Sequence, residues 1–214
     1  MLGGVAIVTG ANSGVGRSVT ELLLAAGVQV TLVCRNQARG EHAINAIKRA
    51  QPGAKATLEL ADLSCPDSVR NLASRLNSRL RQVDILINNA GLVVERPQTT
   101  EDGFELTFAT SHIGHFLLTN LLFDCLRGSG CIVNVSSTAH RFGNLRRAPL
   151  EDIARGQAWN GAFQAYNDSK LANVLFTMEL ARRWNKHGIV ANALHPGLLS
   201  TNIWNRGHNR KGLF

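Results

Sequence analysis

The chain has 214 residues, of which 44% are hydrophobic and 6% aromatic, and this composition is ordinary for one α/β domain with a packed core. The formal net charge is +8, but the basic residues are scattered and no recognised nucleic-acid motif accompanies them, so we expect no nucleic-acid partner. No apolar run approaches the roughly 18 residues of a membrane-spanning helix, and the first strand starts too near Met1 for a signal peptide. We therefore predict one domain over residues 1–214, without a transmembrane segment and in the cytoplasm.

Short apolar runs alternate with helical segments along the whole chain. The predicted strands lie near residues 4–9, 28–33, 56–60, 83–88, 131–136 and 189–194. This alternation predicts a doubly wound parallel β-sheet. The longest irregular stretch, residues 138–161, is expected to overhang a substrate cleft, because loops of such length in a compact domain are usually functional or mobile.

A glycine-rich turn, TGANSGVGR, follows the first strand and opens a helix. Its glycines fall where the backbone must turn tightly and approach a pyrophosphate, which then rests on the N-terminus of the helix. The residues of this turn that we assign to a dinucleotide are Gly10, Asn12, Ser13, Gly14, Val15, Gly16 and Arg17. The strand before the turn and the second apolar strand after its helix favour this assignment over a purely structural turn.

The residues after the second strand indicate which dinucleotide is bound. NAD-binding members of this fold place an Asp or Glu there to hold the ribose 2′-hydroxyl. This chain has Cys34, Arg35 and Asn36 instead. A cation suits the 2′-phosphate of NADP, and Arg17 adds a second one, so we predict NADP. The alternative that stays open is that Arg35 only caps the sheet and Arg17 is a solvated helix residue.

Tyr166 and Lys170 lie four residues apart in YNDSK, before a long apolar helical run. Residues at this spacing share one face of a helix. An ammonium about 4 Å from a phenol would lower the pKa of the tyrosine by roughly three units, less the opposing effect of desolvation. The pair is therefore a candidate acid and base, although such pairs also occur by chance on surface helices.

Taken in order, these motifs resemble the short-chain dehydrogenase/reductase family over essentially the whole chain. The further motifs are NNAG at residues 88–91, IVNVSS at 132–137 and HPG at 195–197. Within the family, HIGHFLLTNLL, NVSSTAH and YNDSKLANVLFTMEL look most like the retinol-dehydrogenase and WW-domain-oxidoreductase branch. The resemblance implies a Rossmann-type doubly wound parallel sheet with helices on both faces. Family members continue past the position of Phe214 with one more strand and helix, so we expect this chain to lack them.

The resemblance also assigns roles to single residues. Ser137 matches the catalytic serine that acts with Tyr166 and Lys170. Ser111 stands where the family has an asparagine as fourth catalytic residue; that asparagine helps to hold a water linking the lysine to solvent, so we expect a weaker proton relay here. Further cofactor contacts are assigned to Asp62, Leu63, Asn89, Ala90, Gly91, Pro196, Gly197 and Thr201, and to Tyr166 and Lys170 themselves.

Two functions therefore remain open. The first is an NADP-dependent oxidoreductase that interconverts an alcohol and a carbonyl, with a retinoid, a steroid or another lipophilic small molecule as substrate and a homo-oligomer as a possible assembly. The second is an NADP-binding or scaffold protein without turnover. His112 and His115, three apart on a helix, suggest a metal site, but no carboxylate or cysteine joins them in sequence, so we predict no metal.

Overall fold

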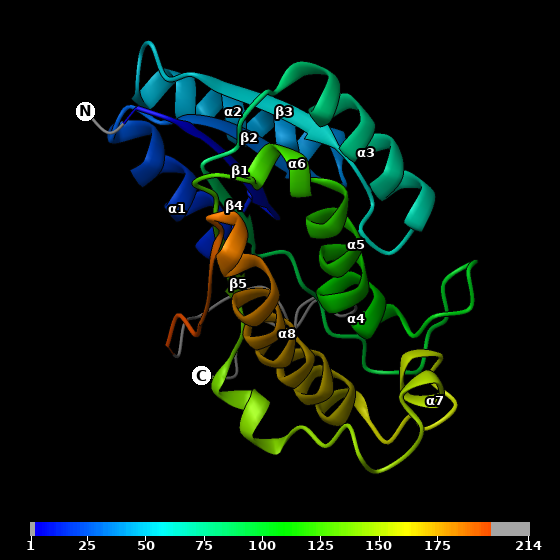
Figure 1. The fold of residues 1–214 in the computed structure, drawn as a ribbon. Helices are drawn as coiled ribbons and strands as arrows, with labels where there is room; N and C mark the ends of the chain where they lie inside the picture. The colour runs from blue at the N-terminus through cyan, green and yellow to red at the C-terminus, as the bar shows by residue number, and fades with distance from the viewer. Residues whose placement is uncertain (1–2, 198–214) are drawn as a thin grey trace.

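The computed structural model of the chain describes residues 3–197, and these form a parallel sheet flanked by helices (Figure 1). The strands are β1 (Val5–Thr9), β2 (Gln29–Cys34), β3 (Ala56–Leu60), β4 (Ile85–Asn88), β5 (Cys131–Val135) and β6 (Val190–Leu194). Their order in the sheet is β3-β2-β1-β4-β5-β6, and every neighbouring pair is parallel. The doubly wound parallel sheet predicted from the sequence is confirmed, and each predicted strand overlaps an observed one.

The helices connect these strands. They are α1 (Gly14–Ala25), α2 (Gln37–Ala50), α3 (Pro66–Arg79), α4 (Leu106–Phe108), α5 (Gly114–Leu121), α6 (Phe123–Leu126), α7 (Leu150–Ala154) and α8 (Ala162–Trp184), with the short turns η1 (Ala109–Ile113), η2 (Thr138–Phe142) and η3 (Asn185–His187). The π-helical turn η1 joins α4 to α5, so its backbone is wider than the α-helix on either side.

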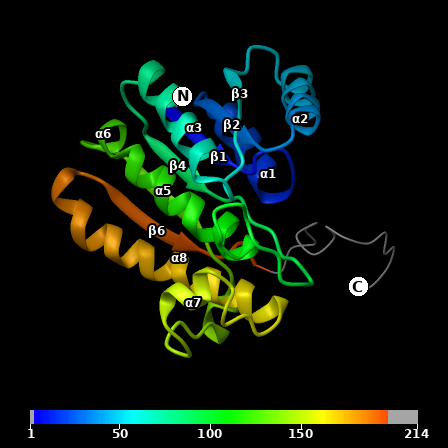
Figure 2. The same cartoon turned by 90° about the vertical axis from the view of Figure 1, so that its right-hand side faces the viewer.

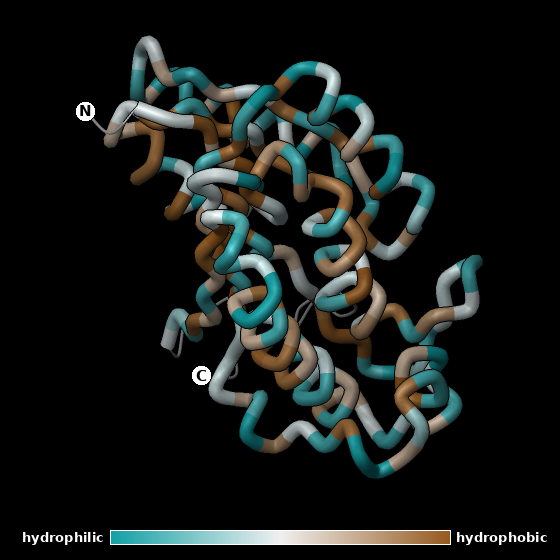
Figure 3. Tube along the Cα trace, viewed as in Figure 1, coloured by the Kyte–Doolittle hydropathy of each residue, from teal (hydrophilic) through white to brown (hydrophobic). Residues whose placement is uncertain are grey.

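Alternate residues of each strand face opposite sides of the sheet, and this places a core on each side. Ile7 of β1 packs in a cluster with α3, α5 and α8, whereas Ala6 and Val8 pack in a second cluster with α1 and α2. Figure 2 shows α1 and α2 apart from the other helices, and Figure 3 shows apolar and polar residues alternating along α5 and α8. Helices therefore cover both faces of the sheet.

The order of the strands reverses at β1 and β4. The connection from β1 leads to one side of the sheet, and the connection from β4 leads to the other, so a crevice opens beyond the carboxyl ends of these two strands. The glycine-rich turn follows β1 and the NNAG motif follows β4. The fold thus brings two motifs that lie about 80 residues apart in the sequence to one place.

The segment between β5 and α8 differs from the sequence expectation. It is not irregular, because it contains η2 and α7, and a buried carboxylate fixes it to α8. Arg147 donates to Asp168 Oδ2 from two nitrogens, at 2.9 and 3.2 Å, and the backbone N–H of Asn144 donates to Asp168 Oδ1 at 2.8 Å. Asp168 is fully buried, so its charge is balanced within the protein. The position of this segment over a substrate cleft stays a prediction.

One finding concerns membranes. Among residues 3–197, no helix has both the length and the apolar character needed to cross a bilayer.

Candidate active site

The glycine-rich turn adopts a backbone that only glycine fits. Gly10 and Gly14 have φ values of +65° and +53°, a region that other residues rarely enter. A Cβ added at Gly16 would lie 2.5 Å from the carbonyl oxygen of Gly10, so the turn has no room for a side chain there. Helix α1 begins at Gly14 with no acidic residue in its first turn. Its unpaired N–H groups and positive end suit an anion such as a pyrophosphate.

Side chains from two other strands brace this turn. The Thr9 hydroxyl accepts hydrogen bonds from the N–H groups of Asn89 and Ala90, at 2.9 and 3.0 Å. The Asn89 amide donates back to the carbonyl of Thr9 at 2.8 Å, so this side chain holds the turn itself. The sulfur of Cys34 accepts from the N–H groups of Ala11 and Asn12, and burial raises the pKa of its thiol to about 11. The roles of Asn12 and Cys34 in this bracing were not predicted from the sequence.

Both arginines predicted to bind a 2′-phosphate are paired with carboxylates in the structure. Arg17 Nε lies 2.8 Å from Glu21 Oε1, and Arg35 Nη1 lies 3.6 Å from Asp62 Oδ2. The Arg35 side chain is 52% exposed, and exposed pairs contribute at most about 1 kcal/mol. A doubly charged phosphate can therefore compete for these cations.

The residues after β3 have different surroundings. Asp62 Oδ1 accepts from the N–H and the hydroxyl of Ser64, at 2.9 and 2.6 Å, so its orientation is fixed locally. Leu63 is buried in the core under α5, where its carbonyl meets Gly114 at a distance that leaves no space for a Cβ. The Leu63 side chain thus packs the core, and its cofactor contact stays a prediction.

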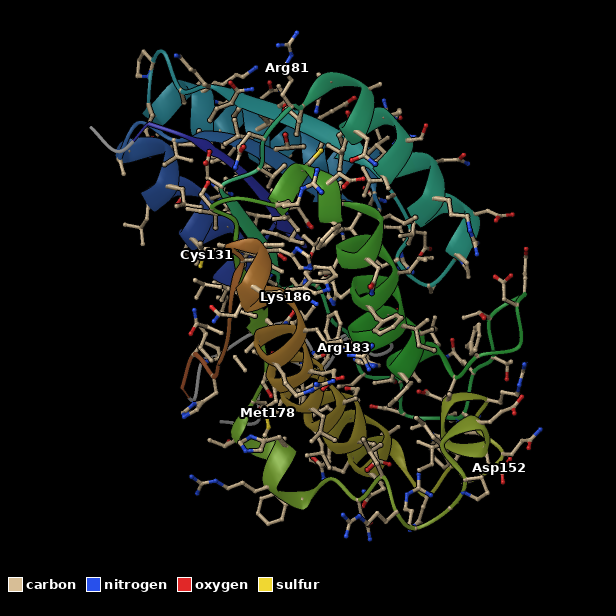
Figure 4. All side chains as sticks on the ribbon, in the orientation of Figure 1. Arg81, Cys131, Asp152, Met178, Arg183 and Lys186 are labelled. Carbon is tan, nitrogen blue, oxygen red and sulfur yellow. The ribbon has the colours of Figure 1, made fainter. Side chains whose placement is uncertain are left out.

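The catalytic candidates come together at the start of α8 and the end of β5. The Ser137 and Tyr166 side chains are hydrogen-bonded to each other, and the Ser137 hydroxyl also accepts from the N–H of Ala139 at 3.2 Å. Lys170 Nζ lies 5.5 Å from the centroid of the Tyr166 ring. Tyr166 and Lys170 come from the first half of α8, and Ser137 lies between β5 and η2. The labelled Met178 and Arg183 come from the second half of α8 (Figure 4).

The prediction that the pKa of Tyr166 is lowered is wrong. Burial raises the pKa of Tyr166, and the hydrogen bond from Ser137 opposes this only in part. Lys170 Nζ donates to the carbonyl of Val135 at 2.9 Å, and burial lowers the pKa of this lysine to about 8. Burial therefore has the largest effect on the pKa of this phenol.

Ser111 lies in the π-helical turn and is fully buried. Its hydroxyl has no hydrogen-bond partner among the residues that the structure describes. Its carbonyl, by contrast, accepts from Asn173 Nδ2 at 3.0 Å and from His115 Nδ1 at 3.2 Å. Ser111 therefore contacts α8 through its backbone carbonyl. Asn173 was not predicted from the sequence as a residue of this site, although its place three residues after Lys170 puts it on the same face of α8.

The remaining residues singled out from the sequence are those that follow β6 and the histidine pair His112 and His115. Gly197 has a φ of +86°, and its N–H donates to His195 Nδ1 at 3.3 Å, which gives His195 a backbone role. Pro196 precedes it, and Thr201 lies outside the described residues. His112 and His115 have no acidic or thiol neighbours that could complete a metal site, since residues 3–197 contain no cluster of three such ligands.

The fold belongs to the Rossmann-type class, with a glycine-rich turn at its switch point. The sequence matches the family described as short chain dehydrogenase over residues 4–149, and the chain belongs to this family. Human retinol dehydrogenase 14 is 40% identical over 223 aligned residues, which cover 97% of this chain and 65% of that protein. Human retinol dehydrogenase 13 is 40% identical, with 94% and 60% covered. The chain thus spans less than two thirds of the length of these relatives.

Solved structures agree with this assignment. The crystal structure of an uncharacterised protein from Mycobacterium Paratuberculosis superposes with a TM-score of 0.81 at 36% identity and covers 94% of this chain and 71% of that one. A short chain dehydrogenase from Burkholderia cenocepacia J2315, solved in complex with NADP, superposes with a TM-score of 0.73 at 26% identity, with 93% and 76% covered.

Proposed function

We propose that this chain binds NADP and interconverts an alcohol and a carbonyl. The observation that carries the proposal is the meeting of Ser137, Tyr166 and Lys170 beside the carboxyl ends of β4 and β5, with the serine and tyrosine hydrogen-bonded to each other. Such a group can hold a carbonyl oxygen and exchange a proton with it. The glycine-rich turn lies at the same edge of the sheet.

The glycine-rich turn at residues 9–17, here called the cofactor cradle, favours the binding of a nicotinamide dinucleotide. Gly10 and Gly16 leave the space that a phosphate backbone needs, and the first turn of α1 carries no opposing acid. Arg17 and Arg35 are the cations that would hold a 2′-phosphate in place of their present carboxylate partners. The related Burkholderia enzyme was solved with NADP. When bound, the reduced cofactor supplies a hydride to a carbonyl carbon.

The chain's own residues would then manage the oxygen and its proton. Ser137 donates a hydrogen bond to the carbonyl oxygen, and Tyr166 gives that oxygen a proton. The phenol of Tyr166 is protonated at neutral pH, since its ordinary pKa is 10.0 and burial raises it further, so it holds the proton that it would give to the substrate oxygen in the reductive direction. Lys170, whose pKa is lowered to about 8, can give a proton back to the phenol of Tyr166 near neutral pH.

The substrate class follows from the relatives. They are retinol dehydrogenases by name, so we extend the proposal to a retinoid, a steroid or another lipophilic alcohol or carbonyl. A cytoplasmic location and a homo-oligomeric assembly stay predictions.

One observation favours a second function, an NADP-binding protein without turnover. The buried hydroxyl of Ser111 makes no hydrogen bond within the described part of the chain, and a serine side chain is shorter and has fewer donors for a proton relay than the family's asparagine. A chain that binds the cofactor but cannot exchange protons with solvent would bind NADPH and transform nothing.

The test is a fluorescence titration with NADPH together with turnover assays on a panel of aldehydes and ketones. We expect binding and turnover, and we expect Tyr166→Phe to keep NADPH affinity while lowering kcat by about 10² to 10⁴. Ser169→Ala is the matched control, since it removes a hydroxyl that donates only to the backbone of Tyr166. Binding without turnover on any substrate would establish the second function, and no binding would exclude both.

A further inference from the structure

His115 is a buried histidine that none of the proposed steps uses. It lies in α5, directly after the π-helical turn, and only 1% of its surface is exposed. Its two ring nitrogens contact groups from different parts of the chain. Nδ1 lies 3.2 Å from the carbonyl of Ser111, and Nε2 lies 2.8 Å from the hydroxyl of Thr9.

The partners fix which nitrogen carries the proton. A carbonyl oxygen only accepts, so Nδ1 must be the donor to Ser111. Burial is the main cause that lowers the pKa of His115 to about 3, and the charges of Lys170 and His112 lower it further, so the ring is neutral. Nε2 therefore has a free lone pair, and it accepts the hydrogen of the Thr9 hydroxyl at 2.8 Å in preference to the carbonyl of Ile87, which lies 3.4 Å from the same hydroxyl.

The contacts extend in both directions from this ring. On one side, the Thr9 oxygen receives the N–H groups of Asn89 and Ala90, which brace the cofactor cradle. On the other side, the carbonyl of Ser111 also receives the amide of Asn173, one helical turn after Lys170. Every hydrogen bond in this chain of contacts is buried or partly buried.

Asn173 has its own second partner. Its Oδ1 accepts from His112 Nδ1 at 3.0 Å, and the His112 ring packs among Phe108, Phe116 and Phe176. The Asn173 amide cannot rotate without losing both of its hydrogen bonds, so this series of hydrogen bonds is anchored on α8.

We propose that His115 is a positioning residue, which holds the hydroxyl of Thr9 at the cofactor cradle and the carbonyl of Ser111 at the catalytic helix in a fixed relation. The proposal rests on the proposed oxidoreductase function. It explains why a fully buried histidine occupies this place, where its two ring nitrogens join the carbonyl of Ser111 to the hydroxyl of Thr9.

Two substitutions separate the two contacts. In His115→Asn the amide nitrogen replaces Nδ1, so the donor to Ser111 is kept and the acceptor for Thr9 is lost. In His115→Gln the terminal amide reaches the place of Nε2, so the Thr9 contact is kept and the Ser111 contact is lost. Thr31→Val is the control, because it removes a side-chain hydrogen bond between β2 and β3, to Thr57, that involves neither Thr9, Ser111 nor Asn173.

We expect His115→Asn to weaken NADPH binding at least about threefold while kcat at saturation changes less than about threefold. We expect His115→Gln to lower kcat at least about tenfold with NADPH affinity kept within about threefold. Thr31→Val should lower Tm without changing either value. If both His115 variants lose NADPH affinity and kcat to the same extent, in proportion to the fall in Tm, the role of His115 is purely structural and the proposal is overturned. Wild-type affinity and kcat in both variants would also overturn it.

A readout without cofactor completes the test. Nitrogen-15 spectra of labelled histidine should show two neutral rings protonated at Nδ1 from about pH 5 to about pH 9, those of His112 and His115, and only the ring of His115 should be absent from the His115→Gln protein. A His115 ring, identified by this loss, that titrates in this range or carries its proton on Nε2 would overturn the proposal. If the wild type binds NADPH without turnover, the catalytic part of the proposed function fails, and the affinity of His115→Asn together with these spectra decides the role of His115. If it binds no NADPH, the spectra alone decide.

Discussion

Replacing Lys170 by methionine should stabilise the protein at neutral pH while abolishing turnover. Lys170 is buried, and its pKa falls from the ordinary 10.5 to about 8. A difference of about 2.5 pKa units corresponds to roughly 3 kcal/mol at neutral pH, because each unit is worth about 1.4 kcal/mol. Methionine has a similar length and carries no charge, so it avoids this cost.

The sign and the pH range follow from the two pKa values. The folded-state pKa lies below the unfolded one, so the folded protein bears the whole cost below about pH 8 and loses it progressively as the pH rises toward 10.5. The methionine variant also leaves the carbonyl of Val135 without its donor, which costs about 1 to 3 kcal/mol at every pH. The net gain at neutral pH is therefore roughly 1 kcal/mol, but the part that varies with pH belongs to the lysine charge alone.

Urea unfolding followed by the fluorescence of the chain's three tryptophans measures both proteins. Between about pH 7 and about pH 9.5, the wild type should gain roughly 2 kcal/mol relative to Lys170→Met. Lys55→Met is the control, since Lys55 is exposed and its removal should leave the pH profile unchanged. A constant difference between wild type and Lys170→Met across this range would refute the reasoning, because it would mean that burial does not depress the lysine pKa.

Three further predictions test the cofactor, the turn at Ser111 and the buried ion pair. The wild type should bind NADPH at least about tenfold more tightly than NADH, because charge-assisted contacts contribute roughly 1.5 to 3 kcal/mol each, and Arg35→Asp should reverse this order in a fluorescence titration; equal affinities would contradict the assignment. Ser111→Ala should raise the free energy of unfolding by about 1 kcal/mol, since it removes a buried hydroxyl that has no partner among residues 3–197, and should keep kcat within about threefold; a larger loss of kcat would show that the hydroxyl acts through a water. Arg147→Met should lower the free energy of unfolding by about 3 to 5 kcal/mol, because it leaves the Asp168 carboxylate buried without its cation; a loss below about 1 kcal/mol in urea unfolding would show that the carboxylate does not need this partner.

Local patterns explain why so much of the fold could be predicted. The strands are short apolar runs, and their alternation with helices leaves few ways to pack a parallel sheet. The glycines at positions 10, 14 and 16 predict a tight turn because the backbone conformation and the close contacts found there exclude other residues. The spacing of Tyr166 and Lys170 predicts a shared helix face, which depends only on helix geometry.

The sequence could not determine the electrostatics of the site. The spacing of Tyr166 and Lys170 suggested that the ammonium would lower the pKa of the phenol, but the structure directs the ammonium to the carbonyl of Val135 and buries the phenol. Desolvation depends on every atom packed around a group, and those atoms come from several elements. The same holds for Arg35, whose carboxylate partner, Asp62, follows a different strand.

The local sequence therefore determined the elements, the cofactor turn and the identity of the candidate acid and base. Only the tertiary structure decided which backbone groups they meet. The contact between Thr9 and His115 joins residues 106 positions apart, and it exists because β1 and α5 pack against each other in the folded sheet. Helix and strand patterns repeat over a few residues, so they carry no information about such a pair, whereas packing brings both side chains into one buried space where each must find a partner.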